Sequence, residues 1–127
     1  MYDLVERQRK LSPAIVKHFA ACIINIMEYM HCRRVLWREL KIESFVIDHQ
    51  GYLTLVDLMH LEQLSQDDTH VSNPSKATLL YLAPEVLSSQ GYGFETDLWS
   101  LGVIIYRMLI GEFPYGHNKV LEDEEIL

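Results

Sequence analysis

The sequence predicts a mainly α-helical fold with a small β-hairpin. Two long stretches repeat apolar residues at helical spacing, and two short runs rich in β-branched and aromatic residues flank a turn that ends in glycine. The chain has 127 residues, of which 49% are hydrophobic and 23% are charged, so it has room for one domain with an apolar core.

Two helices are expected near the N-terminus. Tyr2 to Arg9 is a short amphipathic stretch that is rich in charge. Ser12 followed by Pro13 is typical of a helix start, because serine caps the first backbone amides and proline suits the first helical position. Apolar residues then recur and predict a long helix from Pro13 to His31 whose stripe packs in the core: Ile15, Phe19, Cys22, Ile23, Ile26, Met27 and Met30.

A hairpin and a polar segment are expected in the middle of the chain. Phe45 to Ile47 and Tyr52 to Val56 are β-prone runs, and the turn between them ends in Gly51. From Glu62 to Lys76 the composition becomes polar, which favours a segment with little structure of its own.

A third helix is expected from Asp97 to Ile110. Thr96 or Glu95 is expected to cap its start, and Gly111 with Pro114 marks its end. The stretch is apolar on nearly every side, which is typical of a buried central helix.

The charge and the cysteines exclude several classes of protein. A net charge of −7 argues against nucleic acid and anionic membranes as partners, since both need clustered lysine and arginine. Cys22 and Cys32 make no disulfide framework, no signal peptide is visible, and the apolar run Leu101 to Ile110 is too short to span a bilayer. We therefore expect a cytoplasmic protein.

Four ordered motifs resemble those of protein kinases. Residues 35–48, V-L-W-R-E-L-K-I-E-S-F-V-I-D, resemble the catalytic loop [H/Y]-R-D-L-K-P-E-N-x-x-x-D. V-D-L-M at 56–59 stands where the metal-binding D-F-G belongs, and A-P-E at 83–85 and D-L-W-S-L-G at 97–102 follow intact. The wording around these motifs is most similar to the cyclic-nucleotide-dependent (cAMP/cGMP-dependent, AGC-type) Ser/Thr kinases.

The resemblance implies a partial kinase domain over residues 1–127. We expect a large lobe that lacks the small lobe and the last helices. Within it, residues 35–48 are the catalytic-loop remnant, 56–60 the metal-loop remnant, 60–85 the activation-type segment and 97–110 the central helix.

The resemblance also implies ATP and Mg²⁺ as the family's cofactors, although we expect this chain alone to bind neither in the usual way. Glu39 stands at the catalytic aspartate and is one methylene longer, which displaces its oxygens by about 1 Å or more. Glu39 is either a weak base or no base. Lys41 stands at the lysine that contacts the transferred phosphate.

The metal and nucleotide positions are altered as well. Ser44 replaces an asparagine that ligates the second metal, and a hydroxyl is a weaker ligand for a hard cation. Asp57 matches the aspartate of D-F-G, while Met59 replaces its glycine and stiffens the local backbone. Val46 stands at a cofactor-binding position of the family.

Other matching positions are structural or contact the substrate. The resemblance implies structural roles for Arg38, Glu85, Asp97 and Trp99. Asp97 would accept hydrogen bonds from the catalytic-loop backbone, and Glu85 would normally pair with a later arginine. It implies substrate contacts for Glu43, Thr78 and Arg107, the last of which replaces an acid that reads basic peptides.

The sequence thus predicts a catalytically inactive, pseudokinase-like fragment. One alternative is a weakly active Ser/Thr kinase whose small lobe is supplied by a longer product. Another is a decoy or scaffold that binds a kinase regulatory subunit through surfaces near Arg107 and residues 111–120, and a third is a gene fragment that folds poorly. Exposed apolar surface where the missing parts would pack also predicts self-association.

Overall fold

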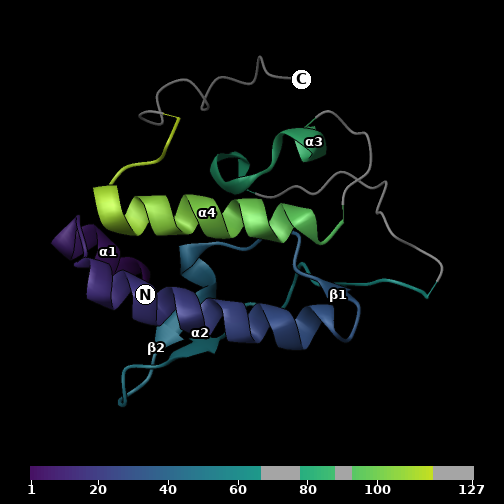
Figure 1. The fold of residues 1–127 in the computed structure, drawn as a ribbon, viewed down its shortest axis with the longest axis horizontal. Helices are drawn as coiled ribbons and strands as arrows, with labels where there is room; N and C mark the ends of the chain where they lie inside the picture. Colours follow the sequence, from purple (N-terminus) through teal and green to yellow (C-terminus); the bar gives the residue numbers. More distant parts are fainter. Residues whose placement is uncertain (67–77, 88–92, 116–127) are drawn as a thin grey trace.

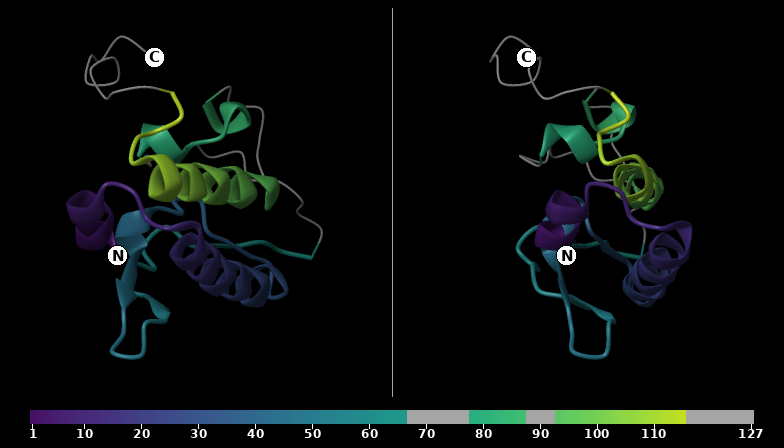
Figure 2. Two further views of the ribbon diagram at one scale, coloured as in Figure 1. Left: turned by 60° about the vertical axis from the view of Figure 1, so that its left-hand side comes forward. Right: turned by 90° about the vertical axis from the view of Figure 1, so that its left-hand side faces the viewer.

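The computed structural model describes residues 1–66, 78–87 and 93–115. Its elements in chain order are α1 (Tyr2–Gln8), α2 (Pro13–His31), β1 (Val35–Leu36), β2 (Phe45–Ile47), β3 (Leu53–Leu55), β4 (Glu62–Gln63), α3 (Pro84–Leu87) and α4 (Glu95–Ile110), with 3-10 turns at Ile42–Ser44 and Leu79–Tyr81. Helices α2 and α4 lie side by side (Figure 1), and the β2–β3 hairpin extends away from α4 (Figure 2). The mainly helical fold with a small hairpin is confirmed.

Helix α2 has the predicted bounds. The Ser12 hydroxyl accepts a hydrogen bond from the backbone amide of Ile15 at 3.5 Å, and Pro13 is the first helical residue. Four residues at helical spacing are buried on one face: Val16, Phe19, Ile23 and Met27. Ile15 belongs to the predicted stripe but is 43% exposed, because it lies at the edge of the buried face and lines a cavity between α1, α2 and the hairpin.

The main core lies between α2, α4 and the segment that joins them. Its fully buried members include Ile23, Trp37, Leu40, Ile42, Phe45, Ile104 and Met108. Trp37 and Phe45 pack with their ring centroids 5.4 Å apart, and Trp37 is 2% exposed. Trp37 therefore contributes to the core, as an aromatic residue of this size is expected to do.

The hairpin forms as predicted. Strands β2 and β3 are antiparallel, with Val46 opposite Thr54. In the turn the Asp48 carboxylate accepts hydrogen bonds from the amides of Gln50 and Tyr52 at 2.8 and 2.9 Å. Gly51 has φ +88°, a conformation that side chains with a Cβ rarely adopt.

The polar segment contains a strand that the sequence prediction missed. Glu62–Gln63 forms β4 and pairs antiparallel with β1. The next residue, Leu64, is 5% exposed and packs in a second small core with Leu36, Leu82, Ala83 and Val86. One buried leucine thus holds a polar dipeptide in a strand. Residues 67–76 of the predicted segment lie outside the described ranges.

Helix α4 differs from the prediction in two respects. It begins at Glu95 with Phe94 as its N-cap, and Thr96 is already helical, its hydroxyl donating to the Gly93 carbonyl at 2.8 Å. The helix is also not buried on every side, since an apolar stripe remains exposed: Leu98 60%, Trp99 37%, Tyr106 41% and Ile110 41%. With Pro114 and Tyr115, part of this stripe borders a cavity of about 280 Å³. The predicted end at Gly111 is confirmed, with φ +86°.

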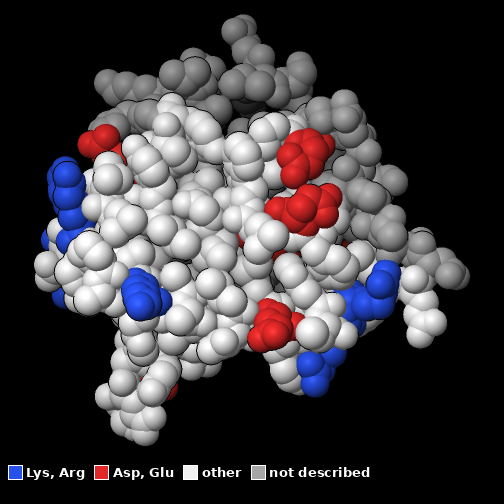
Figure 3. Space-filling view, viewed as in Figure 1, with Lys and Arg blue, Asp and Glu red and all other residues white. Residues whose placement is uncertain are grey.

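The charged side chains are spread over the visible surface. Figure 3 shows a broad uncharged area over α2 and α4, with separate acidic and basic residues around it. In the described part of the chain, no helix combines the length and the apolar character that crossing a bilayer requires.

Candidate active site

The loop after β1 is fastened to α4 by a buried carboxylate. Asp97 is 1% exposed, and its two oxygens accept hydrogen bonds from the backbone amides of Trp37 at 3.0 Å and Arg38 at 3.2 Å. His31, at the end of α2, lies with Nε2 2.7 Å from Asp97 Oδ2. Arg38 has φ +67°, so the chain reverses here in a conformation that costs about 1–2 kcal/mol for a residue with a side chain. The hydrogen bonds to Asp97 offset that cost.

The loop places Glu39 inside the protein. This residue is 6% exposed, and both of its oxygens have partners. Oε1 lies 2.6 Å from Lys41 Nζ and accepts a hydrogen bond from the Thr78 hydroxyl at 3.1 Å. Oε2 lies 2.8 Å from Nε2 of His60. The carboxylate is therefore enclosed by partners from three parts of the chain.

These partners keep Glu39 ionised. Burial raises the pKa of the carboxyl group, but the hydrogen bond and charge of Lys41, the charge of His60 and the hydrogen bond from Thr78 together outweigh burial and hold the pKa below its usual value. A lowered pKa in the folded state means that the ionised form stabilises the fold. That stability is present above the pKa of an unfolded glutamate and is lost as the pH falls through the folded-state value.

We expect Glu39→Gln to lower the free energy of unfolding by about 1–2 kcal/mol at neutral pH, because the substitution weakens hydrogen bonds to a charged group. The difference between the variant and the unmodified chain should narrow as the pH falls below about 4.3, the ordinary glutamate value. Urea unfolding at pH 7 and at pH 3.5 measures it. A difference that stays constant over this range would contradict the ionised state assigned to Glu39.

The positions expected to hold metal do not fit a pair of Mg²⁺ ions. Ser44 is 1% exposed, and its hydroxyl oxygen is buried without a hydrogen-bond partner in the described part of the chain. Asp57 Oδ1 accepts a hydrogen bond from the backbone amide of Met59 at 3.2 Å, and Oδ2 lies 3.9 Å from Lys41 Nζ. Asp57 alone could hold one Mg²⁺ if waters and phosphates completed its shell, whereas the buried hydroxyl of Ser44 is a poor ligand for a second ion.

Val46 lies on the outer face of the hairpin. It is 45% exposed, and Val56, which alternates onto the same face, is 53% exposed. Asp57 follows directly. The apolar face of the hairpin thus lies next to the carboxylate that the sequence assigns to metal.

The predicted substrate residues Glu43 and Arg107 are close to each other. Arg107 is 8% exposed, and its Nη1 lies 3.6 Å from Glu43 Oε1. Nη1 also donates to the Tyr81 hydroxyl at 2.6 Å, which in turn donates to Glu43 at 3.3 Å. Burial raises the pKa of the Tyr81 phenol and the charge of Glu43 adds to this effect, so Tyr81 keeps its proton.

Glu85 and Trp99, which the sequence predicts to be structural residues, lie away from the group around Glu39. Glu85 is half-buried in α3. Trp99 is in α4 and stacks on Tyr115, with ring centroids 6.2 Å apart and planes 5° from parallel. The structure thus brings Glu39, Lys41, Asp57 and Thr78 together, and places Glu85 and Trp99 elsewhere.

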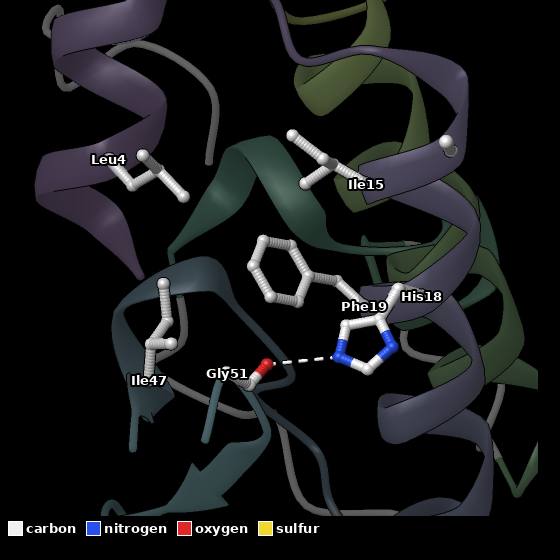
Figure 4. Close-up of a pocket in the computed structure, with 7 residues that line it drawn as sticks. Leu4, Ile15, His18, Phe19, Ile47 and Gly51 are labelled. Carbon is white, nitrogen blue, oxygen red and sulfur yellow. Dashed lines mark hydrogen bonds between the residues drawn. The ribbon is translucent and has the colours of Figure 1, made fainter. Parts of the chain in front are cut away.

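A separate apolar cavity lies between α1, α2 and the hairpin. It has a volume of about 450 Å³ and is lined by Leu4, Ala14, Ile15, His18, Phe19, Ile47 and Gly51. Figure 4 shows the His18 ring beside the hairpin turn, with Nε2 2.9 Å from the Gly51 carbonyl oxygen. The cavity shares no lining residue with the group around Glu39.

Sequence reasoning missed two histidines of the site. His60 contacts Glu39, and His31 contacts Asp97. The position of His60, three residues after Asp57, was a usable signal, because a titratable residue within the predicted metal-loop remnant is a candidate site residue. His31 gave no comparable signal, since its contact with Asp97 spans 66 positions.

Comparisons with known proteins agree with the motifs. The family model described as protein kinase domain matches residues 1–126. The chain is 32% identical over 94% of its length to a cGMP-dependent protein kinase of Plasmodium berghei (strain Anka). It is 35% identical over 91% of its length to the atypical protein kinase C of Drosophila melanogaster, and 35% identical over 87% to protein kinase C zeta type of Oryctolagus cuniculus. The chain covers 13%, 19% and 19% of these relatives, respectively.

Proposed function

The chain belongs to the protein kinase family, and from this membership we propose that it is a Ser/Thr-kinase-like module, corresponding to part of the large lobe, that does not transfer phosphate by itself. The branch we propose is the cyclic-nucleotide-dependent one, which its cGMP-dependent relative supports. Kinases of this family generally use ATP and Mg²⁺.

The state of Glu39 carries the proposal. Phosphoryl transfer needs a carboxylate that can orient a substrate hydroxyl, and a cation that neutralises the transferred phosphate. The carboxylate at the position that would orient the hydroxyl, Glu39, is 6% exposed and has partners on both oxygens. The cation at the position that would neutralise the phosphate is Lys41, and its Nζ lies 2.6 Å from Oε1 of the same carboxylate. A substrate would have to displace partners that already stabilise each other.

The metal positions support the same proposal. The hydroxyl of Ser44 is buried, so a cation from solvent could not reach it without a change in the structure. Asp57 already accepts a hydrogen bond within its own turn. If Mg²⁺ and ATP were bound, they would supply the phosphate and its charge neutralisation. Asp57 would then be the carboxylate left to hold the metal, and Lys41 would have to leave Glu39 to reach a phosphate.

A thermal-shift titration with ATP and Mg²⁺ tests the proposal. A ligand at about a hundred times its Kd adds about 2.7 kcal/mol to stability, which raises Tm by several degrees in a domain of this size. We expect a cooperative melt and a shift below about 1 °C. Asp57→Asn and a titration with Mg²⁺ alone serve as controls. A saturable rise that Asp57→Asn abolishes would overturn the proposal.

A second candidate is a weakly active ATP-dependent Ser/Thr kinase whose small lobe comes from a longer product. The exposed apolar face formed by Val46 and Val56 favours it, because a nucleotide base or another lobe could cover that face. This candidate predicts phosphate transfer to a peptide only when the chain is part of such a product. The transfer should disappear with Asp57→Asn.

Partner binding remains a prediction. The expected partners are a kinase regulatory subunit or a second copy of the chain. Arg107, which the sequence analysis places near the partner-binding surface, is 8% exposed and engaged by Tyr81 and Glu6. A partner would therefore have to use the residues around Arg107.

A further inference from the structure

A buried arginine is enclosed by residues from four separate parts of the chain, which we call the arginine cage. Arg107 Nη2 lies 2.5 Å from Glu6 Oε1 of α1, and Nη1 lies 2.6 Å from the Tyr81 hydroxyl and 3.6 Å from Glu43 Oε1. The guanidinium carbon lies 4.5 Å from the centre of the Phe113 ring. Figure 1 shows how this is reached, since α1 lies beside the C-terminal end of α4.

The exposure of the cage is uneven. The side chain of Arg107 is 9% exposed, whereas those of Glu6 and Glu43 are 50% and 38% exposed. The two carboxylates thus lie on the solvent side of the site, and the guanidinium group of Arg107 lies on its buried side. Two carboxylates stand against one cation, so the cage would remain strongly acidic if the arginine head were absent.

The geometry suits a guanidinium group in particular. A guanidinium is planar, carries five N–H donors in a fixed fork and stacks on aromatic rings, whereas a lysine ammonium is a compact point charge. Here the two ends of the fork reach different partners, Glu6 and Tyr81, while one side of the plane lies near Phe113. Both the fork and the flat face are therefore used.

We propose that Glu6, Glu43, Tyr81 and Phe113 form a guanidinium-binding site that Arg107 occupies from within the chain. The occupied site cannot accept an arginine side chain from a peptide, and the charge of Arg107 repels such a peptide. This consequence for peptide selection rests on the proposed function, but the occupied site itself does not. Emptying the site should create a binding place for a small guanidinium ion.

Chemical rescue of Arg107→Ala tests the proposal. We expect the variant to melt about 5 °C lower than the unmodified chain, because two carboxylates and a buried phenol lose their cation. Methylguanidinium should raise its melting temperature saturably. Methylammonium, which has the charge without the fork, should raise it far less, and neither ion should raise that of the unmodified chain. Equal effects of the two ions, or no rescue, would overturn the proposal.

A double-mutant cycle keeps the test informative if Arg107→Ala does not fold. Arg107→Met retains an apolar stem against Phe113 and removes the charge. Glu6→Gln should lower Tm in the unmodified chain and have little effect in the Arg107→Met background, because the two side chains act through each other. Equal losses in both backgrounds would refute the pairing. Neither readout uses nucleotide, so its outcome is independent of whether the chain transfers phosphate.

Discussion

Replacing Asp97 with alanine is expected to lower the free energy of unfolding by about 3–5 kcal/mol, the largest loss expected from any single change considered for this chain. Asp97 is 1% exposed and accepts hydrogen bonds from the amides of Trp37 and Arg38. Without the carboxylate these amides are buried and unpaired. The positive φ of Arg38 then also loses the contact that stabilises it.

Asp97→Asn is the matched control. The amide keeps the size of the side chain and one acceptor oxygen, but its NH₂ group would face a donor, so we expect about half the loss of the alanine variant. Urea unfolding measures the free energy of unfolding of both variants. The slope of that free energy against urea concentration shows whether the surface exposed on unfolding has changed. A cost below about 1 kcal/mol for Asp97→Ala would mean that the loop between α2 and the hairpin holds its shape without α4.

Gly111→Ala is expected to lower the free energy of unfolding by about 2–4 kcal/mol. The added Cβ would lie 2.5 Å from the carbonyl oxygen of Arg9, a backbone atom that cannot move alone. Gly111 also has φ +86°, where an L side chain is strained. The clash would push apart the end of α4 and the connection from α1 to α2, which is otherwise held by a hydrogen bond from the Leu11 amide to the Met108 carbonyl at 2.8 Å.

Gly51→Ala separates the two effects. Gly51 has nearly the same φ, +88°, but nothing lies within 4 Å of its added Cβ. It should therefore cost only about 1–2 kcal/mol, the penalty of the left-handed conformation. The excess loss at Gly111 then measures the close approach of Arg9. Equal losses at the two glycines would show that the approach relaxes without cost.

Both predictions concern how the candidate site is held together. Asp97 connects the loop that carries Glu39 and Lys41 to α4. Gly111 allows the end of α4 to lie close to Arg9, which follows the helix that carries Glu6. Asp97→Ala would therefore also disturb the surroundings of Glu39, and Gly111→Ala would disturb the contact between Arg107 and Glu6. Under the proposed function these contacts maintain a binding scaffold.

Much of the local structure could be predicted from sequence, because its causes are local. The start of α2 follows from Ser12 and Pro13, and the end of α4 follows from Gly111, each acting within one helical turn. The hairpin follows from two β-prone runs and a turn at Gly51. The motifs predict a candidate site at Glu39, Lys41, Ser44 and Asp57, and the structure brings Glu39, Lys41 and Asp57 together.

What could not be predicted depends on contacts between distant residues. The polar strand β4 exists because Leu64 finds a core contributed by other segments. The exposed stripe of α4 shows the limit of an apolar pattern, which reports hydrophobicity and not which faces have neighbours.

By itself, the sequence determined the family and the helix and hairpin framework, and it predicted which catalytic positions carry altered residues. Only the tertiary structure decided what those residues do with their charges: Glu39 is enclosed by Lys41, His60 and Thr78, and Arg107 is enclosed by Glu6, Glu43 and Tyr81. The physical reason is that the ionic state and availability of a side chain depend on burial and on partners within a few ångströms, and folding brings those partners together from positions up to 101 residues apart.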